Sequence, residues 1–217
     1  ASAKKHNIAV CNAPGYSTES VAQHAIALML ALTNRVAPLD AEVRKGRWTQ
    51  TFGDCTWDAP IIELNRKTFG VLGTGEIGCA AARIASALGM RIIGHSRSER
   101  KDFIGSYVSL DELYRTSDVL SLHCAATPET RGMIDKSVFS RMKKSAILIN
   151  TARGVLINEQ DLAQALNNDL IYAAGLDVAA VEPLSADNSL LRAKNCLITP
   201  HVAWIPLETR MRLMGIA

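Results

Sequence analysis

The chain has 217 residues, of which 48% are hydrophobic and 21% charged, with a formal net charge of +3. These are the proportions of a soluble globular protein, so a mainly disordered chain is excluded. Positive and negative residues are interleaved without a Lys/Arg block, and the longest apolar stretch, 25–32, is far shorter than the roughly 20 residues of a membrane span. We therefore expect neither nucleic acid nor a membrane as a partner.

The five cysteines are scattered through the chain and form no CxxC pair. An odd number of cysteines in apolar runs favours free thiols in a reducing compartment over a disulfide framework or a zinc site. No secretory signal is visible at the start, which reads Ala1 rather than Met. We expect a cytoplasmic protein without a metal site.

The first elements are a short strand over residues 7–11 and a helix over 19–34, with Ser17 or Thr18 as its N-cap. Apolar side chains recur along this helix at helical spacing and predict a buried face: Val21, Ala25, Leu28, Met29 and Leu32. The following segment, 48–60, contains Gly53, Pro60 and two tryptophans, which predicts an irregular arm or long loop.

From residue 68 onward, short apolar segments alternate with helical patterns. Strands are predicted over 68–73, 91–94, 118–123, 146–150, 173–177 and 196–199, and helices over 77–88, 110–114, 136–142 and 159–167. Strands that are apolar throughout are buried on both faces, and strand–helix alternation gives right-handed crossovers. The fold class is therefore α/β, a doubly wound parallel sheet of the Rossmann dinucleotide-binding type.

The segment 73–78 has the pattern G-x-G-x-x-G and connects an apolar strand to an alanine-rich helix, which is the context this fingerprint requires. Gly73 permits the tight turn, Gly75 lets the backbone approach a pyrophosphate, and Gly78 lets the helix pack close to the strand. The N-terminus of that helix would then face the diphosphate. We expect Gly73, Thr74, Gly75, Glu76, Ile77 and Gly78 to bind the cofactor.

Selectivity for the ribose depends on the residues after the second strand of the sheet. An NAD-binding domain carries an acidic residue there, but this strand is followed by Ser96, Arg97 and Ser98. Arg97 could neutralise a 2′-phosphate while the two serines donate to it. The alternative is that these side chains belong to a solvent-exposed loop and bind no ligand. We therefore expect a nicotinamide dinucleotide, NADP or NAD, with NADP slightly favoured.

Three further strand ends carry polar residues: Arg153 follows one, Asp177 and Glu182 follow the next, and His201 follows the last. Ligands of open α/β sheets bind at the carboxyl ends of the strands. An arginine, a glutamate and a histidine delivered there suggest an anion clamp, a tuning carboxylate and an acid/base. Singly, each could instead be a surface arginine, a helix-capping glutamate or a core histidine.

The segments APGYSTESVAQHAIALML, GVLGTGEIG, ILINTARGVLI, AAGLDVAAVEP and ITPHVAW resemble the D-isomer-specific 2-hydroxyacid dehydrogenases, most of all the glycerate dehydrogenase (hydroxypyruvate reductase) branch. The resemblance implies that Arg153 binds the substrate carboxylate, that His201 is the general acid and base, and that Glu182 pairs with His201 and favours its imidazolium form. It also implies that further residues line the cofactor site: Thr151, Ala152, Asp177, Cys124, Thr130 and Ala203.

Two histidines and a cysteine admit other interpretations. His24 lies on the first long helix and is expected to be structural, and Cys124 is expected to pack beside the cofactor rather than act as a nucleophile. His123 could have either a structural or a functional role. The region of Trp48 and Trp57 resembles the part of these enzymes that embraces a second subunit, so we expect a homodimer.

The resemblance also predicts the domain organisation. Residues 1–14 would be a remnant of a smaller flavodoxin-like substrate domain, 15–204 the NAD(P)-binding domain, and 205–217 a return helix toward the substrate domain. About a hundred N-terminal residues of the substrate domain would then be absent. The chain is expected to bind cofactor but to turn over poorly.

The predicted function is hydride transfer between a nicotinamide cofactor and a small D-2-hydroxy or 2-oxo acid, either glycerate/hydroxypyruvate or glycolate/glyoxylate. The alternative is a non-enzymatic dinucleotide-sensing scaffold of the corepressor kind. An adenosyl-binding, methyltransferase-like module is a third possibility, but it leaves Arg153, Glu182 and His201 unexplained.

Overall fold

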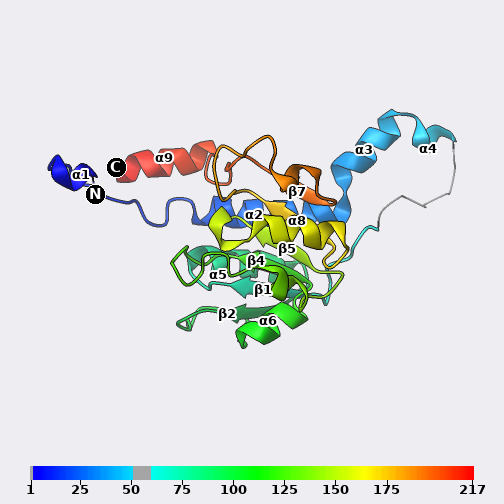
Figure 1. Ribbon diagram of the computed structural model, residues 1–217, viewed down its shortest axis with the longest axis horizontal. Helices are drawn as coiled ribbons and strands as arrows, with labels where there is room; N and C mark the ends of the chain where they lie inside the picture. The colour runs from blue at the N-terminus through cyan, green and yellow to red at the C-terminus, as the bar shows by residue number, and fades with distance from the viewer. Residues whose placement is uncertain (1, 51–59) are drawn as a thin grey trace.

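A computed structural model describes residues 2–50 and 60–217 and contains one sheet of seven strands, in the order β3-β2-β1-β4-β5-β6-β7 (Figure 1). All neighbouring strands are parallel. The strands are β1 Thr68–Leu72, β2 Arg91–His95, β3 Ser106–Tyr107, β4 Val119–Leu122, β5 Ile147–Asn150, β6 Ala173–Leu176 and β7 Cys196–Ile198. The predicted doubly wound α/β fold is confirmed.

Helices cover both faces of this sheet. One layer consists of α2 (Thr18–Asn34) and α5 (Glu76–Ala87), which pack on each other and on β1, β2, β5 and β6. The other contains α6 (Leu110–Thr116), α7 (Lys136–Phe139) and α8 (Glu159–Asn167). Each layer closes a separate apolar core, so every residue of β1, β4, β5 and β6 is buried. This two-sided burial explains why these strands are almost entirely apolar, with Thr68, Ser121 and Asn150 as their only polar residues.

The strand order reverses between β1 and β4, because the chain builds β2 and β3 on one side of β1 and the remaining strands on the other. In open α/β sheets the crevice for a ligand forms at this reversal, outside the carboxyl ends of the strands. The glycine loop follows β1 at this point, and His123 follows β4.

The strand predicted over residues 7–11 is wrong, whereas Ser17, one of the two residues predicted for the N-cap of α2, occupies that position. Residues 7–11 run as turn and coil after a short helix, α1 (Ser2–Lys5), because no strand within 2–50 and 60–217 pairs with them and Ile8 and Val10 are 61% and 78% exposed. Helix α2 begins after Ser17, but the Ser17 side chain makes no capping hydrogen bond. The hydroxyl of Thr18 donates instead to Gly15 O and Glu76 Oε2, so it ties α2 to the start of α5.

Other elements were also not predicted from the sequence. Helix α3 (Val36–Arg44) precedes the predicted arm and α4 (Arg47–Gln50) overlaps its start; both project from the body of the molecule (Figure 1), while residues 51–59 of the arm, with Trp57, lie outside the described residues. Strand β3 has only two residues, too few for a periodic pattern.

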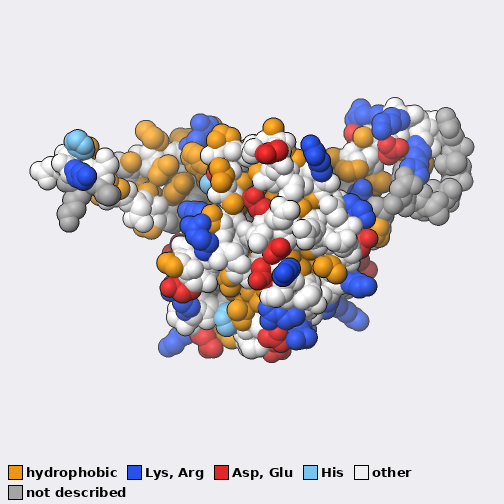
Figure 2. All heavy atoms as spheres, in the orientation of Figure 1, with side chains coloured by type: hydrophobic (Ala, Val, Ile, Leu, Met, Phe, Trp, Pro, Cys, Tyr) orange, Lys and Arg blue, Asp and Glu red, His pale blue; other side chains and the backbone are white. Residues whose placement is uncertain are grey.

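The C-terminal helix α9 (Leu207–Ile216) follows Pro206 and extends away from the sheet beside the N-terminal segment (Figure 1). Arg212 Nε donates to Tyr16 O at 3.0 Å, which joins the two segments. Orange apolar side chains gather over α9 in Figure 2, and those of Leu207, Met211 and Met214 are 60%, 65% and 77% exposed. Among the helices of the described ranges, none is long and apolar enough to cross a membrane.

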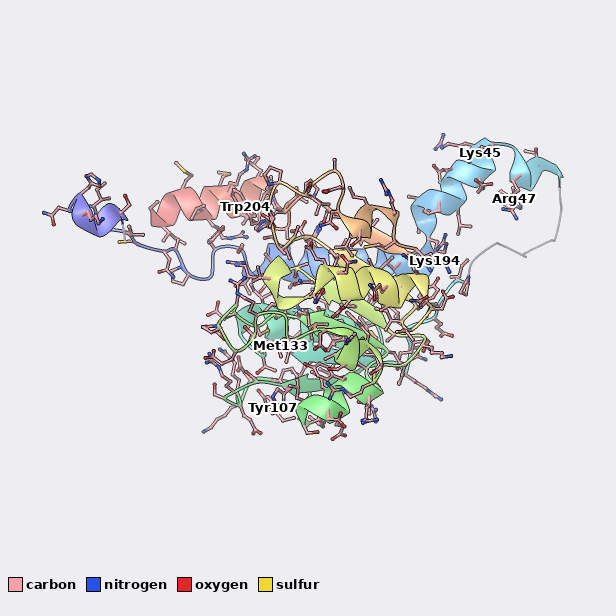
Figure 3. All side chains as sticks on the ribbon, viewed as in Figure 1. Lys45, Arg47, Tyr107, Met133, Lys194 and Trp204 are labelled. Atoms are coloured by element: carbon pink, nitrogen blue, oxygen red, sulfur yellow. The ribbon has the colours of Figure 1, made fainter. Side chains whose placement is uncertain are left out.

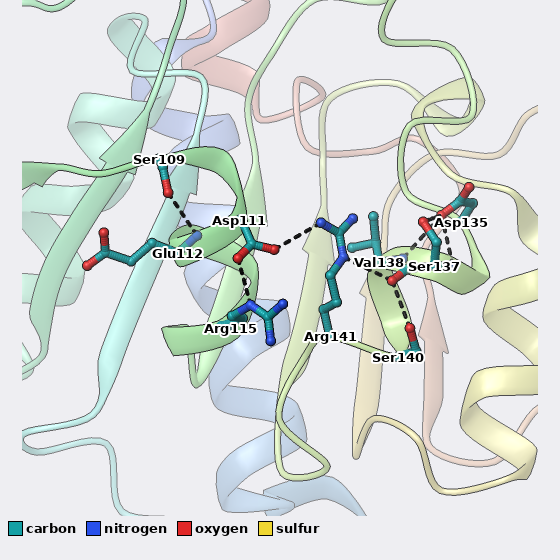
Figure 4. A network of polar contacts seen from close by, with 9 residues as sticks. All are labelled: Ser109, Asp111, Glu112, Arg115, Asp135, Ser137, Val138, Ser140 and Arg141. Carbon is teal, nitrogen blue, oxygen red and sulfur yellow. Dashed lines mark hydrogen bonds and ion pairs between the residues drawn. The ribbon is translucent and has the colours of Figure 1, made fainter.

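Surface ion pairs join α6 to α7 on the face opposite α2 (Figure 4). Asp111 accepts from Arg115 at 2.6 Å and from Arg141 at 3.0 Å, and the Arg141 guanidinium lies 5.2 Å from the Tyr114 ring centroid. Hydrogen bonds from these two arginines keep the pKa of Asp111 below its ordinary value. Because the groups are exposed, this network contributes little free energy of folding, and it has no role in the site described next.

Candidate active site

Two of the three fingerprint glycines are required by the protein's own packing. Gly73 has a φ of +96°, and a Cβ there would lie 2.6 Å from Cys124 N. A Cβ on Gly78 would lie 2.2 Å from Gly73 O, because α5 packs directly against the loop that precedes it. Side chains at these positions would therefore displace backbone.

Gly75 differs from both, because a Cβ there would meet nothing within 4 Å. Its φ of −69° and ψ of −172° are open to any residue, so neither packing nor backbone conformation explains this glycine. It is also the N-cap of α5 and makes no side-chain capping bond, which leaves N–H groups of the first turn free for an anion. The empty space over Gly75 is where a diphosphate would lie.

Two cavities with shared walls run along the carboxyl ends of the strands. The smaller, of 380 Å³, is lined by Leu72, Gly73, Gly75, His95, Ser96, Arg97, Leu110, His123, Cys124, Ala125, Thr127, Glu129, Thr130 and Met133. The larger, of 590 Å³, is lined by Tyr16, Ser17, Val21, Ile77, His123, Cys124, Ala125, Ala126, Thr151, Ala152, Arg153, Asp177, His201, Ala203 and Trp204. The two cavities share His123, Cys124 and Ala125, so together they form one crevice of the kind in which open α/β sheets bind their ligands.

Most of the predicted site residues line these cavities, and five do not. Thr74 and Gly78 are buried beneath the glycine loop, Glu76 Oε2 faces Thr18, and Ser98 is exposed in the loop after β2. Glu182 lines a neighbouring cavity of 590 Å³, of which His201 forms part of the wall.

His201 and Glu182 form a short pair, with 2.7 Å between His201 Nδ1 and Glu182 Oε2. The second carboxylate oxygen, Oε1, accepts from Ala179 N at 3.0 Å, which fixes the glutamate. Burial acts to raise the pKa of Glu182, but the hydrogen bonds from His201 and Ala179 outweigh it and lower the pKa. The carboxylate is therefore ionised at neutral pH, and with Nδ1 occupied the imidazole has Nε2 left for proton transfer.

Asp177 organises the backbone that carries His201. It is 1% exposed, and its carboxylate accepts from Thr199 Oγ1 at 2.6 Å and from the backbone N of Val202 and of Ala203, both at 2.9 Å. Burial acts to raise the pKa of Asp177, and these hydrogen bonds, with one from His24, lower it overall. His24 Nε2 lies 2.9 Å from Thr199 Oγ1, so His24 has the structural role that we expected.

Arg153 projects from a turn that Asn150 shapes. The Asn150 side chain is fully buried, donates to Arg153 O at 2.9 Å and accepts from Ala152 N at 3.0 Å. The Arg153 guanidinium is exposed at the rim of the larger cavity and donates to Ala152 O, and no carboxylate in the described ranges forms an ion pair with it. It is therefore free to bind an anionic ligand.

A buried hydroxyl in the larger cavity has no protein partner. Thr151 is 8% exposed, and within the described residues its Oγ1 makes no hydrogen bond. Burying a hydroxyl without a partner is unfavourable by about 1–3 kcal/mol, so such groups usually mark a ligand or a water. Together with the open space over Gly75, this hydroxyl indicates that the crevice fits a bound dinucleotide.

Gly154 connects the turn carrying Arg153 to the loop carrying Glu182. A Cβ on Gly154 would lie 1.9 Å from the carbonyl carbon of Ala179 and 2.3 Å from Ala180 N. The same loop is held by Glu159, whose carboxylate accepts from Ala180 N at 2.7 Å and from Asn188 Nδ2 at 2.8 Å. The two loops therefore pack as one unit.

We expect Gly154→Ala to lower the free energy of unfolding by about 1–3 kcal/mol, because backbone must move to admit the methyl group. Gly215→Ala is the matched control, since a Cβ there meets nothing within 4 Å. Urea denaturation of both variants checks this, and a Gly154→Ala protein as stable as its control would refute the close packing of the two loops.

His123 follows β4 and lines both cavities, with its Nε2 at 2.8 Å from Ser121 Oγ. Burial lowers the pKa of His123 to about 4. Burial also raises the pKa of the Cys124 thiol, consistent with packing rather than nucleophilic chemistry.

The depressed pKa of His123 predicts a loss of stability in mild acid. In the unfolded chain this histidine has its ordinary pKa of 6.5, whereas in the folded chain its pKa is about 4. The contribution of the neutral histidine to the free energy of unfolding is therefore complete above pH 6.5 and falls as the pH drops toward 4. At about pH 4.5 the loss is about 2 kcal/mol. His123→Gln, which does not titrate, should lose correspondingly less stability between pH 7 and pH 4.5 in urea denaturation without ligand. If the stability of the two proteins depended on pH in the same way, this would contradict the lowered pKa of His123.

Several cavity residues were missed by the sequence analysis. Tyr16, Ser17 and Val21 reach the larger cavity from the start of α2, and Thr127 and Glu129 come from the loop after β4. No motif marks them; their position follows from the strand order, which places that loop beside the glycine loop.

Known proteins are similar to this chain in sequence and in structure over the region that carries the site. The family described as D-isomer specific 2-hydroxyacid dehydrogenase, NAD binding domain, matches residues 26–203. A hydroxypyruvate reductase of Blautia hydrogenotrophica is 46% identical over 99% of this chain and 68% of its own length. A glycerate dehydrogenase of Methylorubrum extorquens is 39% identical over 96% of this chain and 66% of its own length.

A crystal structure of D-lactate dehydrogenase from Aquifex aeolicus, complexed with NAD and lactic acid, superposes with a TM-score of 0.85 at 35% identity, covering 99% of this chain and 68% of that one. The chain thus spans about two thirds of the length of these proteins. The resemblance, the fold and the family match agree: the chain belongs to the D-isomer specific 2-hydroxyacid dehydrogenase family and contains its NAD-binding domain.

Proposed function

We propose that this protein transfers a hydride reversibly between a nicotinamide dinucleotide and a short 2-oxo or D-2-hydroxy acid, with hydroxypyruvate or glyoxylate as the oxo acid. The observation that carries the proposal is the His201–Glu182 pair, at 2.7 Å, with His201 on the wall of the cavity whose rim holds Arg153. An acid/base and an anion-binding guanidinium are the two groups that reduction of a 2-oxo acid requires from the protein.

Each of these residues has a distinct role in the proposed mechanism. Arg153 binds the substrate carboxylate through its planar guanidinium and orients the carbonyl. His201 donates a proton from Nε2 to the carbonyl oxygen during reduction and takes it back in the reverse direction. Glu182 fixes the orientation of the imidazole through the contact at Nδ1. The bound dinucleotide supplies the hydride.

The nicotinamide end of the cofactor would be held by residues at the larger cavity. Thr151 offers a hydroxyl without a protein partner, and Ala152 and Ala203 line the same cavity. Asp177 already accepts from Thr199, Val202 and Ala203, so its contact with the carboxamide would add to its role in fixing the loop of His201. We place the cofactor-binding domain at residues 15–204.

We propose NADP as the preferred cofactor. Ser96 and Arg97 line the smaller cavity beyond Gly75, no acidic residue ends β2, and the Arg97 side chain is exposed for a 2′-phosphate. We expect Arg97→Asp to weaken NADPH binding on the order of 10- to 100-fold, through loss of charge-assisted hydrogen bonds, and to leave NADH binding within about two-fold. Nicotinamide fluorescence titrations check this. Equal loss for both cofactors would sink the 2′-phosphate assignment.

Turnover distinguishes an enzyme from the alternative, a dinucleotide-sensing scaffold. We propose that the chain alone binds cofactor with little turnover, since its relatives are about half as long again. NADPH oxidation with glyoxylate and hydroxypyruvate is therefore measured on the chain and on the chain joined to the additional residues of the Blautia hydrogenotrophica relative. Rates as high in the chain as in the longer form would refute the proposal that the chain alone turns over little. Cofactor binding without turnover in either form would favour the scaffold.

We also propose that the protein is a cytoplasmic homodimer. Helix α3 buries none of its own residues, and Val36, Val43 and Trp48 are 67%, 37% and 65% exposed on the projecting α3–α4 segment (Figure 3 shows its position). Exposed apolar side chains on a projecting element favour contact with a second copy. Light scattering of the purified chain distinguishes one copy from two.

A further inference from the structure

The hydroxyl of Tyr107, on the short edge strand β3, lies between two loops of the cofactor site. It is 2.8 Å from Thr74 Oγ1, in the glycine loop, and it accepts from Arg100 N at 2.7 Å, in the loop 96–102. Figure 3 shows Tyr107 at the outer edge of the sheet, beside β2 and α6. One side chain therefore contacts both the loop expected at the diphosphate and the loop expected at the ribose.

The Tyr107 ring is held in place by packing. Its centroid lies 5.0 Å from that of Phe103, which is buried, with 47° between the ring planes. Gly94 leaves room for this cluster, because a Cβ there would lie 2.6 Å from Phe103 Cζ and 2.9 Å from Thr74 Cγ2. Thr74 is itself 1% exposed and does not line the cavities, so its hydroxyl serves this internal contact rather than the ligand.

The loop 96–102 has few restraints of its own. Residues 97–102 are exposed, and the ion pair between Arg100 and Asp102 lies within the loop. Two hydrogen bonds tie the loop backbone at Arg100 to the body of the protein: Arg100 N donates to the Tyr107 hydroxyl at 2.7 Å, and Arg100 O accepts from N of the buried Phe103 at 3.4 Å. The bond to Tyr107 is the shorter of the two and holds the backbone three residues from Arg97.

We propose that Tyr107 is a positioning residue for the dinucleotide: its hydroxyl fixes the loop of Ser96 and Arg97 to the glycine loop, so that both ends of the adenosine diphosphate half are held in one geometry. The proposal rests on the proposed function, in that it takes Ser96 and Arg97 to face the ribose. It assigns to Tyr107 an effect on discrimination between a 2′-phosphate and a 2′-hydroxyl without direct contact with either.

The test compares Tyr107→Phe with Tyr172→Phe in the purified chain. Tyr107→Phe removes the hydroxyl and keeps the ring against Phe103, while the buried Tyr172 hydroxyl has no partner within the described residues and lies away from the cavities. Thr74→Val removes the other partner of the bond and is used if Tyr107→Phe does not fold. The readouts are amide hydrogen exchange of residues 96–102 and affinities for NADPH and NADH.

We expect Tyr107→Phe to speed amide hydrogen exchange in residues 96–102 and to weaken NADPH binding about 3- to 10-fold, as for the loss of one hydrogen bond. The effect on NADH binding should be smaller, and Tyr172→Phe should change neither the exchange nor the affinities. Unchanged exchange and unchanged NADPH affinity would overturn the proposal. If the unmodified chain shows no preference for NADPH, the 2′-phosphate assignment fails, but faster exchange with weaker binding of both cofactors would still support Tyr107 as the positioning residue.

Discussion

Replacing Gly75 by valine is expected to weaken binding of both NADH and NADPH by at least about 100-fold without destabilising the protein. The space that the valine would enter is empty, and the backbone at Gly75 is extended, which suits a β-branched residue. Valine is less favourable than glycine at an N-cap, so the free energy of unfolding should stay within about 1 kcal/mol of the original value. The side chain would instead occupy the position of the diphosphate and block its approach to the N-terminus of α5.

Gly78→Ala provides the contrast, because its Cβ would lie 2.2 Å from Gly73 O. This variant should lose about 1–3 kcal/mol of stability and bind cofactor poorly for that reason. Urea denaturation and fluorescence titration of the two variants separate the roles of the glycines. A stable Gly75→Val protein that still binds either cofactor normally would show that no diphosphate lies over this loop.

The second large effect is expected for His201→Asn, which should lower kcat by about 10²- to 10⁴-fold, the range for loss of a general acid. Asparagine is chosen because His201 has a φ of +54°, a left-handed conformation that asparagine tolerates. Dinucleotide affinity should change little, since the backbone bonds of Val202 and Ala203 to Asp177 remain. The measurement is steady-state reduction of glyoxylate in whichever form of the protein turns over.

Glu182→Gln is the companion variant. Its side-chain oxygen can still accept a hydrogen bond from Ala179 N or His201, while the negative charge is removed. We expect a smaller loss of kcat than for His201→Asn, because Glu182 acts through the imidazole and does not itself transfer the proton. Equal activity of His201→Asn and the unmodified protein would remove His201 from the mechanism.

The parts of the fold that sequence predicted best are those with a simple physical signature. The central strands β1, β4, β5 and β6 are buried on both faces, so most of their residues are apolar and their limits fall within two residues of the predictions. The helix over 159–167 has the predicted bounds, because Asn158 caps its first turn through a hydrogen bond to Asp161 N.

Features that depend on tertiary contacts could not be predicted in this way. Residues 7–11 have a strand-like composition but no neighbouring strand. Thr18 is a plausible N-cap by type, yet its hydroxyl bonds to Glu76, 58 residues away. The shaping of the Arg153 turn by Asn150, and the contact of Tyr107 with both cofactor loops, also join residues whose proximity no local pattern encodes.

The central claim is that this chain binds a nicotinamide dinucleotide over Gly73–Gly78, and a direct titration tests it. NADPH and NADH are each added to the purified chain, and nicotinamide fluorescence is followed, with Gly75→Val as the reference protein. Saturable binding with one site per chain, lost in Gly75→Val while the fold is retained, is the result we predict. A folded chain that binds neither cofactor, or that binds them equally well with valine at position 75, would contradict the assignment.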